Sequence, residues 1–306
     1  MKVSVIIPSY NREDTIGRAI RSVLQQDFKE FELIVVDDGS DDKTVEVVQD
    51  FSDSRISIIQ HSENQGANAA RNSGIDAASG ELISFLDSDD KFHADYLGKV
   101  VRGACRCSEQ CGGIFTSFRM VQGERAIGKY YATDSEITQD YISDGNRIGT
   151  LSCTTFKSDV FSNIGKFDET MPASQDFDFY LRVLNKYTMK GINEVLITKH
   201  LRGDGIGANL NRKQQGFKII KEKHGNKITD EYLSNQNRTT GRLYAEQGKM
   251  KEARWHLRKA INLNANNFAA VYLYIITFFD KRIFNKGVKL GFFIRFSLNQ
   301  YRRRVM

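Results

Sequence analysis

The chain has 306 residues, of which 40% are hydrophobic and 27% charged, and its formal net charge is +6. A chain of this size can bury one large core, or one core and a small second module. Hydrophobic periodicity runs through most of the length without low-complexity tracts, which excludes wholesale disorder. We therefore expect a globular protein with at most two folding units.

The cysteines and the chain ends bear on the cellular compartment. The four cysteines lack the paired C-x-x-C spacing of a structural zinc site, so we expect reduced, incidental thiols. The apolar run before Pro8 lacks the features of a signal peptide. The longest apolar stretch, 268–279, is shorter than the roughly 20 residues of a membrane-spanning helix. These features favour a cytoplasmic protein without a transmembrane anchor.

Strand and helix patterns alternate over the first 90 residues. The expected strands are 3–7, 31–36, 56–59 and 81–86, and the expected helices begin near Asp14 or Thr15, near Val45 and at Ala67. This order predicts a parallel sheet. Ligands of open α/β sheets bind at the carboxyl ends of the strands. The polar loops 8–12, 37–40, 63–66 and 87–90 therefore predict a nucleotide site.

The pattern of the middle segment is mixed. We expect a helix over 95–102, a strand over 113–120, and a helix with an apolar stripe over 177–184 that begins just after Asp176. The polar, turn-rich stretch 123–148 predicts a loop-bearing segment that could contact an acceptor.

The last hundred residues have a different character. Residues 212–224 form a basic amphipathic pattern, and 243–260 resemble a tetratricopeptide-type helical hairpin, with Gly248 in the turn and small residues at Ala253 and Ala260. A lone hairpin cannot bury its own apolar face, so we expect it to pack on the preceding α/β domain.

The C-terminal tail, 281–306, carries eight lysines and arginines and no acidic residue. Aromatic residues alternate with these cations, a composition suited to the headgroup layer of an anionic membrane. A solvated helix that covers the core is the equally weighted alternative. We expect no nucleic-acid partner.

Three carboxylates follow an apolar strand in Asp87-Ser88-Asp89-Asp90. Such carboxylates repel one another unless a positive group lies between them. Mg²⁺ or Mn²⁺ prefers oxygen ligands and binds through one or two carboxylates together with substrate phosphates. An acidic turn that caps the next helix is the structural alternative.

Two further motifs follow other strands. Asp38, in Asp37-Asp38-Gly39-Ser40, could accept hydrogen bonds from a base N–H or a ribose hydroxyl. Arg71, in Ala70-Arg71-Asn72, could meet a base carbonyl or a phosphate. Taken singly, each motif is also typical of plain structure, such as a β-turn at Gly39.

Together these motifs resemble the family 2 glycosyltransferases. The matching text is Val5-Ile6-Ile7-Pro8-Ser9-Tyr10-Asn11, Val35-Val36-Asp37-Asp38-Gly39-Ser40, Asn64-Gln65-Gly66, Ala70-Arg71-Asn72-Ser73-Gly74 and Phe85-Leu86-Asp87-Ser88-Asp89-Asp90. The resemblance is close over 1–100 and looser over 150–205. It implies an α/β, Rossmann-like GT-A domain over 1–210, with a nucleotide-binding half (1–100) and an acceptor half (100–210), and a helical extension over 211–306.

The resemblance also implies roles for single residues. The nucleotide would contact Pro8, Tyr10, Asp38, Asn64, Arg71, Asp87 and Ser88. Asp89 would ligate Mn²⁺ or Mg²⁺, and His200 or Arg202 would meet the diphosphate. Asp176 would be the catalytic base, with Asp178 as competitor. The family's Glu-Asp pair is Gln175-Asp176 here, which removes a neighbouring charge.

The resemblance implies an inverting, metal-dependent glycosyltransferase. It would transfer a sugar from a nucleotide-sugar, with UDP-sugars favoured, to a hydroxyl of a surface polysaccharide or lipid-linked glycan at the inner face of the plasma membrane. A nucleotidyltransferase is one alternative, but it would need a Gly-rich basic loop after the first strand, which Pro8-Ser9-Tyr10-Asn11 does not supply. A catalytically degenerate GT-A scaffold is the other.

Overall fold

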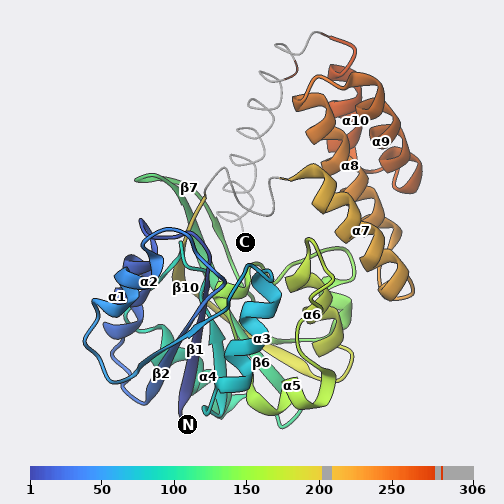
Figure 1. Ribbon diagram of the computed structural model, residues 1–306. Helices are drawn as coiled ribbons and strands as arrows, with labels where there is room; N and C mark the ends of the chain where they lie inside the picture. Colours follow the sequence, from blue (N-terminus) through green and yellow to red (C-terminus); the bar gives the residue numbers. More distant parts are fainter. Residues whose placement is uncertain (202–208, 280–283, 285–306) are drawn as a thin grey trace. The chain divides into compact units, whose positions relative to one another are not determined.

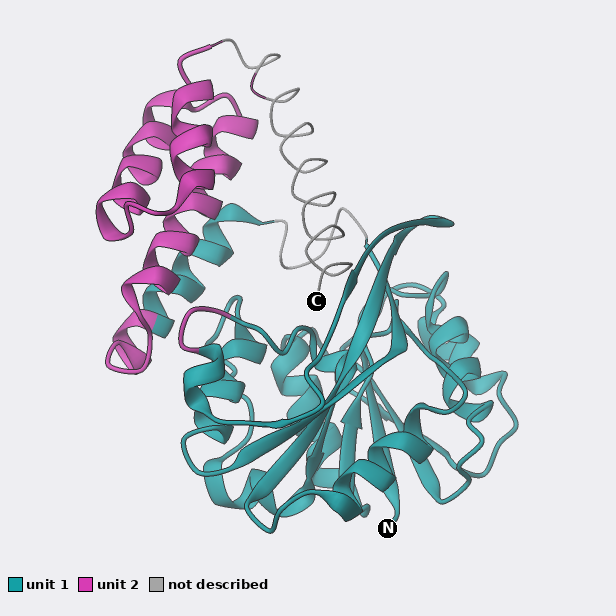
Figure 2. Cartoon of the chain, turned by 180° about the vertical axis from the view of Figure 1, so that it is seen from behind, with its two compact units in different colours: residues 1–142, 146–220 teal, residues 143–145, 221–306 magenta. Residues whose placement is uncertain are grey.

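The computed structural model describes residues 1–201, 209–279 and 284. The chain divides into two compact units, which Figure 2 colours separately. Unit 1 contains residues 1–142 and 146–220, and unit 2 contains 143–145 and 221–306. The basic tail predicted over 281–306 lies outside the described residues, apart from Phe284.

A ten-stranded sheet runs through unit 1 in the order β3-β2-β1-β4-β9-β6-β10-β5, with β7 paired to β6 and β8 to β10 (Figure 1). The strands are β1 Val3–Ser9, β2 Phe31–Asp37, β3 Ile56–Gln60, β4 Leu82–Phe85, β5 Lys91–Phe92, β6 Cys111–Gln122, β7 Arg125–Tyr130, β8 Glu136–Ile137, β9 Thr154–Lys157 and β10 Thr188–His200. The first four strands pair in parallel, as the alternating pattern predicts. Their carboxyl ends therefore share one edge of the sheet.

Helices cover both faces of this sheet. They are α1 Ile16–Leu24, α2 Thr44–Gln49, α3 Ala67–Ala77, α4 Tyr96–Arg106, α5 Ser158–Ile164 and α6 Gln175–Val183. Alternate residues of β1 point to opposite faces. Val3, Val5 and Ile7 belong to a core that also contains buried residues of α1, α2 and α4. The neighbouring residue Ile6 contacts α3, which explains why β1 is apolar along its length.

A cluster of phenylalanine rings fixes α5 and α6 to the sheet. Phe85 at the end of β4 lies 5.3 Å from Phe167, measured between ring centroids. Phe179 of α6 lies 4.5 Å from Phe167 and 5.1 Å from Phe156 of β9. Edge-to-face and tilted pairs of this kind add to the stabilisation that comes from burial. The cluster links the start of α6 to the strand that ends just before Asp87.

The loop expected over 123–148 is wrong in part. Residues 125–130 form β7, which pairs antiparallel with the end of β6, and 136–137 form β8. The residues of β7 are exposed or partly exposed, so this strand needs no regular alternation of apolar and polar residues. Its polar sequence is therefore typical of a loop.

The sequence also gave no prediction for β9 and β10. β10 pairs with β6 through register shifts near Ile192 and Val195, and such irregularities interrupt a period of two.

Unit 2 contains the helices α8 Asp230–Glu246, α9 Met250–Leu263 and α10 Phe268–Ile276. Gly248 turns the chain between α8 and α9 with a φ of +85°, a conformation that glycine tolerates. Ala253, Leu257 and Ala260 of α9 are fully buried, and an added Cβ on Gly241 of α8 would lie 2.7 Å from Leu257. The helices approach closely because small residues face one another. Within the described part of the chain, no helix is both long and apolar enough to cross a membrane.

Candidate active site

The polar loops after β1, β2 and β3 are tied to one another. The backbone N–H of Asn11 donates to the Ser40 hydroxyl at 2.9 Å, which joins the first loop to the second. The carboxylate of Asp38 accepts the backbone N–H groups of Gln65 and Gly66 at 2.9 and 2.8 Å, which joins the second to the third. The structure thus brings together loops that lie up to 55 residues apart in sequence.

Asp38 is buried, and His61 Nδ1 lies 2.8 Å from its carboxylate. Because the Asp38 carboxylate binds His61 and two backbone N–H groups of the loop after β3, it holds in place the loop that carries Asn64. Asn64 itself is exposed, as is Tyr10, while Pro8 is buried in β1 beside Val36. The structure therefore places Tyr10 and Asn64 where a nucleotide could reach their side chains.

Three carboxylates gather after β4. Asp87, Asp89 and Asp90 each offer an oxygen, and these oxygens lie within 4.8 Å of one another. Asp90 is fully buried, and it accepts the Ser152 hydroxyl at 2.7 Å and the backbone N–H of His200 at 3.0 Å. Ser88 between them is also buried. Among the described residues, no side chain donates to the Asp89 carboxylate, which leaves it free to bind a ligand.

Burial and mutual repulsion change the acidity of this cluster. Burial raises the pKa of Asp90 to about 7, with added repulsion from Asp87 and Asp89. Burial and the Asp87 charge also raise the pKa of Asp89. Burial and repulsion disfavour the charged form of these carboxyl groups, and a positive ion bound nearby would favour it again. Oxygen ligands at this spacing suit Mg²⁺ or Mn²⁺, so the residues present fit such an ion.

Lys199, near the end of β10, is a cation that the sequence analysis missed. Its Nζ lies 3.6 Å from Asp87, 3.5 Å from Asp90 and 3.3 Å from the Thr150 hydroxyl. Although burial alone would lower the pKa of Lys199, the neighbouring carboxylates raise it, so the side chain stays charged. Only its place beside His200 in the sequence could have drawn attention to it.

Arg71 of α3 is buried and faces the same cluster. Its Nη2 donates to Asp87 at 3.1 Å and its Nη1 to Asn68 at 3.2 Å, while its buried Nε has no partner among the described residues. Burial alone would raise the pKa of Asp87, but Lys199 and Arg71 together hold it below its usual value. Asp87 is therefore a fixed anion between two cations.

Asp176 lies in the first turn of α6 and is partly buried. Ser174 before it has a left-handed backbone, with φ at +61°, an uncommon conformation outside glycine that often marks functional positions. One carboxylate oxygen accepts the backbone N–H of Phe177 at 2.8 Å and the other accepts Asn146 Nδ2 at 3.0 Å. Burial raises the pKa of Asp176. A carboxylate with a raised pKa suits the work of a general base.

Asp178, the competing candidate for the base, has different surroundings. It is buried and pairs with Arg182 Nε at 3.0 Å. Arg182 also donates to the carbonyl oxygens of Ile164 and Lys166. This network joins α5 to α6, so the geometry favours Asp176.

His200, one of the two candidates for the diphosphate, is the last residue of β10. Burial and the nearby Arg18 guanidinium lower the pKa of His200. Its buried Nδ1 has no partner in the described part of the chain. The imidazole is therefore neutral at pH 7 and offers a hydrogen bond rather than a charge. Arg202, the other candidate, lies outside the described residues.

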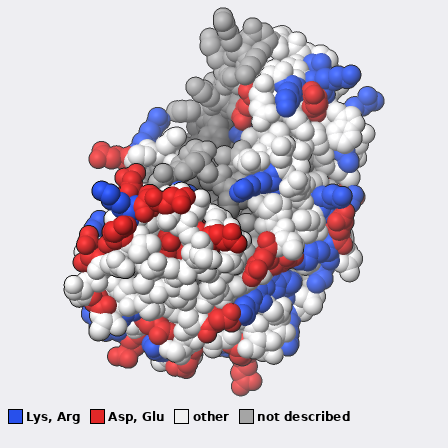
Figure 3. All heavy atoms as spheres, viewed as in Figure 1, with Lys and Arg blue, Asp and Glu red and all other residues white. Residues whose placement is uncertain are grey.

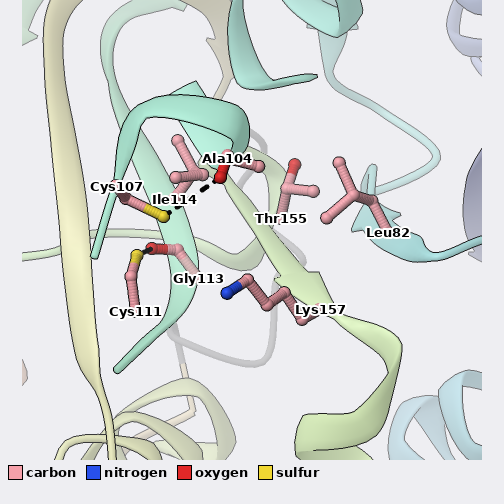
Figure 4. A pocket seen from close by; sticks show the side chains of 8 residues that line it. All are labelled: Leu82, Ala104, Cys107, Cys111, Gly113, Ile114, Thr155 and Lys157. Carbon is pink, nitrogen blue, oxygen red and sulfur yellow. Dashed lines mark hydrogen bonds between the residues drawn. The ribbon is translucent and has the colours of Figure 1, made fainter. Parts of the chain in front are cut away.

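A small pocket elsewhere in unit 1 contains none of the candidate residues. Figure 4 shows its lining from α4, β4, β6 and β9, including Leu82, Ile114 and the thiols of Cys107 and Cys111. Each thiol donates to a backbone carbonyl, of Ala104 and Gly113 respectively. The lining is mainly apolar, with Lys157 of β9 as its charged member, and it contains no carboxylate.

Comparison with known proteins gives a consistent result. A model of the family "Glycosyl transferase family 2" matches residues 4–165. The teichuronic acid biosynthesis glycosyltransferase TuaG of Bacillus subtilis, named as putative, is 34% identical over 68% of this chain and 82% of its own. WfgD of Escherichia coli, named as a UDP-Glc:alpha-D-GlcNAc-diphosphoundecaprenol beta-1,3-glucosyltransferase, is 32% identical over 62% of this chain and 73% of its own.

Among solved structures, residues 1–349 of S. aureus TarS in complex with UDP-GlcNAc superimpose with a TM-score of 0.65. The match covers 95% of this chain and 92% of that chain at 21% identity. This likeness concerns the fold.

Proposed function

Because the chain belongs to glycosyl transferase family 2, we propose that it transfers a sugar from a UDP-sugar to a hydroxyl of a surface polysaccharide or lipid-linked glycan. The name of WfgD includes a UDP-sugar donor and a diphosphoundecaprenol acceptor, and the TarS structure contains UDP-GlcNAc. TuaG is named for teichuronic acid biosynthesis. These names support the donor and acceptor classes.

The donor would occupy the edge formed by the loops after β1 to β4. Pro8, Tyr10, Asp38 and Asn64 would surround the base, with Arg71 beside it. Asp87 would contact the ribose or the water shell of the metal ion, and Ser88 would contact the nucleotide. The support for this placement is that Tyr10 and Asn64 are exposed in loops tied to one another, at the sheet edge where β4 also ends.

The acidic cluster is the observation that carries the proposal. Asp89 would bind Mn²⁺ or Mg²⁺, with Asp87 and Asp90 at its side. Such an ion would stabilise the negative charge that develops on the departing diphosphate. Lys199 would add a second, fixed positive charge, and His200 would donate a hydrogen bond. Arg202 keeps its proposed role at the diphosphate.

Asp176 would accept the proton of the acceptor hydroxyl as that oxygen attacks the anomeric carbon. The new C–O bond forms while the bond from the anomeric carbon to the diphosphate oxygen breaks. Attack from the opposite face inverts the configuration. Asn146 would keep the carboxylate oriented, which its hydrogen bond to Asp176 supports.

The proposed acceptor class also implies where in the cell the enzyme would act. A glycan attached to a lipid diphosphate would place the enzyme at the inner face of the plasma membrane. The basic tail 281–306 would contribute attraction to an anionic membrane.

The first test is calorimetry with UDP, GDP and dTDP and their sugar conjugates, with Mn²⁺ or with EDTA, on wild type and Asp89→Ala. We expect binding of the UDP class with Mn²⁺ and its loss in Asp89→Ala. Failure of every nucleotide to bind would favour the scaffold alternative. Binding of another nucleotide class in place of UDP would show that the donor is not a UDP-sugar.

A further inference from the structure

The helix α10 of unit 2 is apolar on two opposite faces. Ala270, Leu273 and Ile276 are buried in the core of the unit. Phe268, Tyr272, Ile275 and Phe279 are 77%, 39%, 54% and 53% exposed. The spacing of Phe268, Tyr272 and Ile275 places them in one row along the helix axis, and Phe279 follows three residues after the helix ends at Ile276. A helix with apolar side chains on both faces is normally covered on both.

Further aromatic rings are exposed on α9 and just after α10, and each has a cation beside it. Trp255 and Phe278 are 60% and 63% exposed. The Arg254 guanidinium lies 5.0 Å from the centre of the Phe278 ring, and Lys259 Nζ lies 5.1 Å from the Trp255 ring. Figure 3 shows Lys and Arg groups, together with a few Asp and Glu groups, among uncharged surface on the face of unit 2 that it presents. Cations therefore lie beside two of the exposed aromatic rings.

The charge of this segment is one-sided. Between Lys249 and Phe279 the chain has five lysines and arginines and a single acid, Glu252. Lys251, Arg258 and Lys259 are exposed. A second copy of this face would bring like charges together, and so would the tail 281–306, which has eight cations and no acid. The charge complementarity points to an anionic occupant.

We propose that the outer row of α10, together with the cations of α9, is a docking face for an anionic lipid membrane. Phe268, Ile275 and Phe279 would enter the boundary between headgroups and acyl chains, while Arg258 and Lys259 contact the lipid phosphates. This inference deepens the proposed function, since a lipid-linked acceptor would lie in the same surface.

The test is vesicle flotation of the full chain, with phosphatidylglycerol mixed into phosphatidylcholine or with phosphatidylcholine alone. The variants are Phe268→Ser/Ile275→Ser/Phe279→Ser and Arg258→Glu/Lys259→Glu. Arg102→Glu/Arg106→Glu is the matched control, because it makes the same charge change at exposed positions of α4. Circular dichroism checks the fold of each variant, and calorimetry with UDP is run in parallel.

We expect wild type and the control to float with the anionic vesicles. Both test variants should bind about tenfold more weakly or worse, since each surface cation contributes roughly 1 kcal/mol. Flotation of the triple variant at the wild-type level would overturn the proposal. So would light scattering that shows a wild-type dimer dissociated by the triple variant, which would identify a second copy as the occupant. Loss of UDP binding with flotation intact would reject the proposed function alone.

Discussion

At the scale of single residues, Lys199 gives the most direct test of the site. Replacement by methionine removes a cation that lies 3.5 to 3.6 Å from two carboxylates. We expect kcat to fall on the order of 100-fold, because one fixed charge no longer stabilises the departing diphosphate. Binding of Mn²⁺, followed by calorimetry, should tighten instead, since a repelling positive charge has gone.

The control for Lys199→Met is Asp89→Ala, in which both activity and Mn²⁺ binding should fall. If Lys199→Met weakened Mn²⁺ binding as Asp89→Ala does, the lysine would only maintain the structure of the cluster.

Asp176 predicts a pH dependence. Its raised pKa means that the carboxylate takes up a proton at a higher pH than an ordinary aspartate. Since a general base must be unprotonated, kcat/KM should fall as the pH decreases through that value. Asn146→Ala removes a hydrogen bond that favours the charged form, so the acid limb should move to higher pH.

The matched measurement is Asp176→Asn, which should lose roughly 100-fold to 10,000-fold in kcat and show no acid limb from this group. An acid limb at the same pH in wild type and Asn146→Ala would show that Asn146 does not tune the base.

At the scale of elements, the contact of α3 with β1 depends on Gly74. An added Cβ would lie 2.5 Å from Ile6 Cγ2, which no relaxed structure allows. Gly74→Ala should lower the free energy of unfolding by about 1–3 kcal/mol, because the helix must move away from the sheet. Urea unfolding followed by circular dichroism measures the change.

Gly98→Ala on α4 is the matched control. The nearest atom to its added Cβ is the flexible Arg102 guanidinium at 3.4 Å, so stability should stay constant or rise by up to about 1 kcal/mol. Equal effects at the two positions would argue against close packing at Gly74.

The sequence predicted the elements of the first half well for a physical reason. Strands β1, β2 and β4 are largely buried and rich in β-branched or apolar residues, β3 is partly buried, and α1 has a clear apolar stripe, so burial determines most of the pattern. β7 and β10 were not predicted, because backbone pairing rather than an alternation of apolar and polar residues defines them. Exposure hides this alternation in β7. Register shifts interrupt it in β10. The acidic residues after β4 could be predicted because they follow a strand, whereas Lys199 needed the pairing of β10 with β6.

At the scale of the whole molecule, the expected nucleotide-binding half is not separable from the rest of unit 1. β4 lies between β1 and β9, and β5 pairs with β10. A fragment of residues 1–100 would leave β4 with one unpaired edge and Phe85 without its aromatic neighbours. We expect this fragment to be aggregated or unfolded by circular dichroism and light scattering, with residues 1–220 as the folded control. Cooperative unfolding of 1–100 would contradict this.

The pairing of β4 with β9 also bears on the order of events during synthesis. Asp87 emerges from the ribosome about 70 residues before β9, the second neighbour of β4. It emerges more than 100 residues before Lys199 and before His200, whose backbone N–H donates to Asp90. Contacts of such long sequence separation form late in folding. The nascent chain therefore carries three adjacent carboxylates without the lysine that balances them. We therefore expect the proposed donor to bind only after β10 has left the ribosomal tunnel.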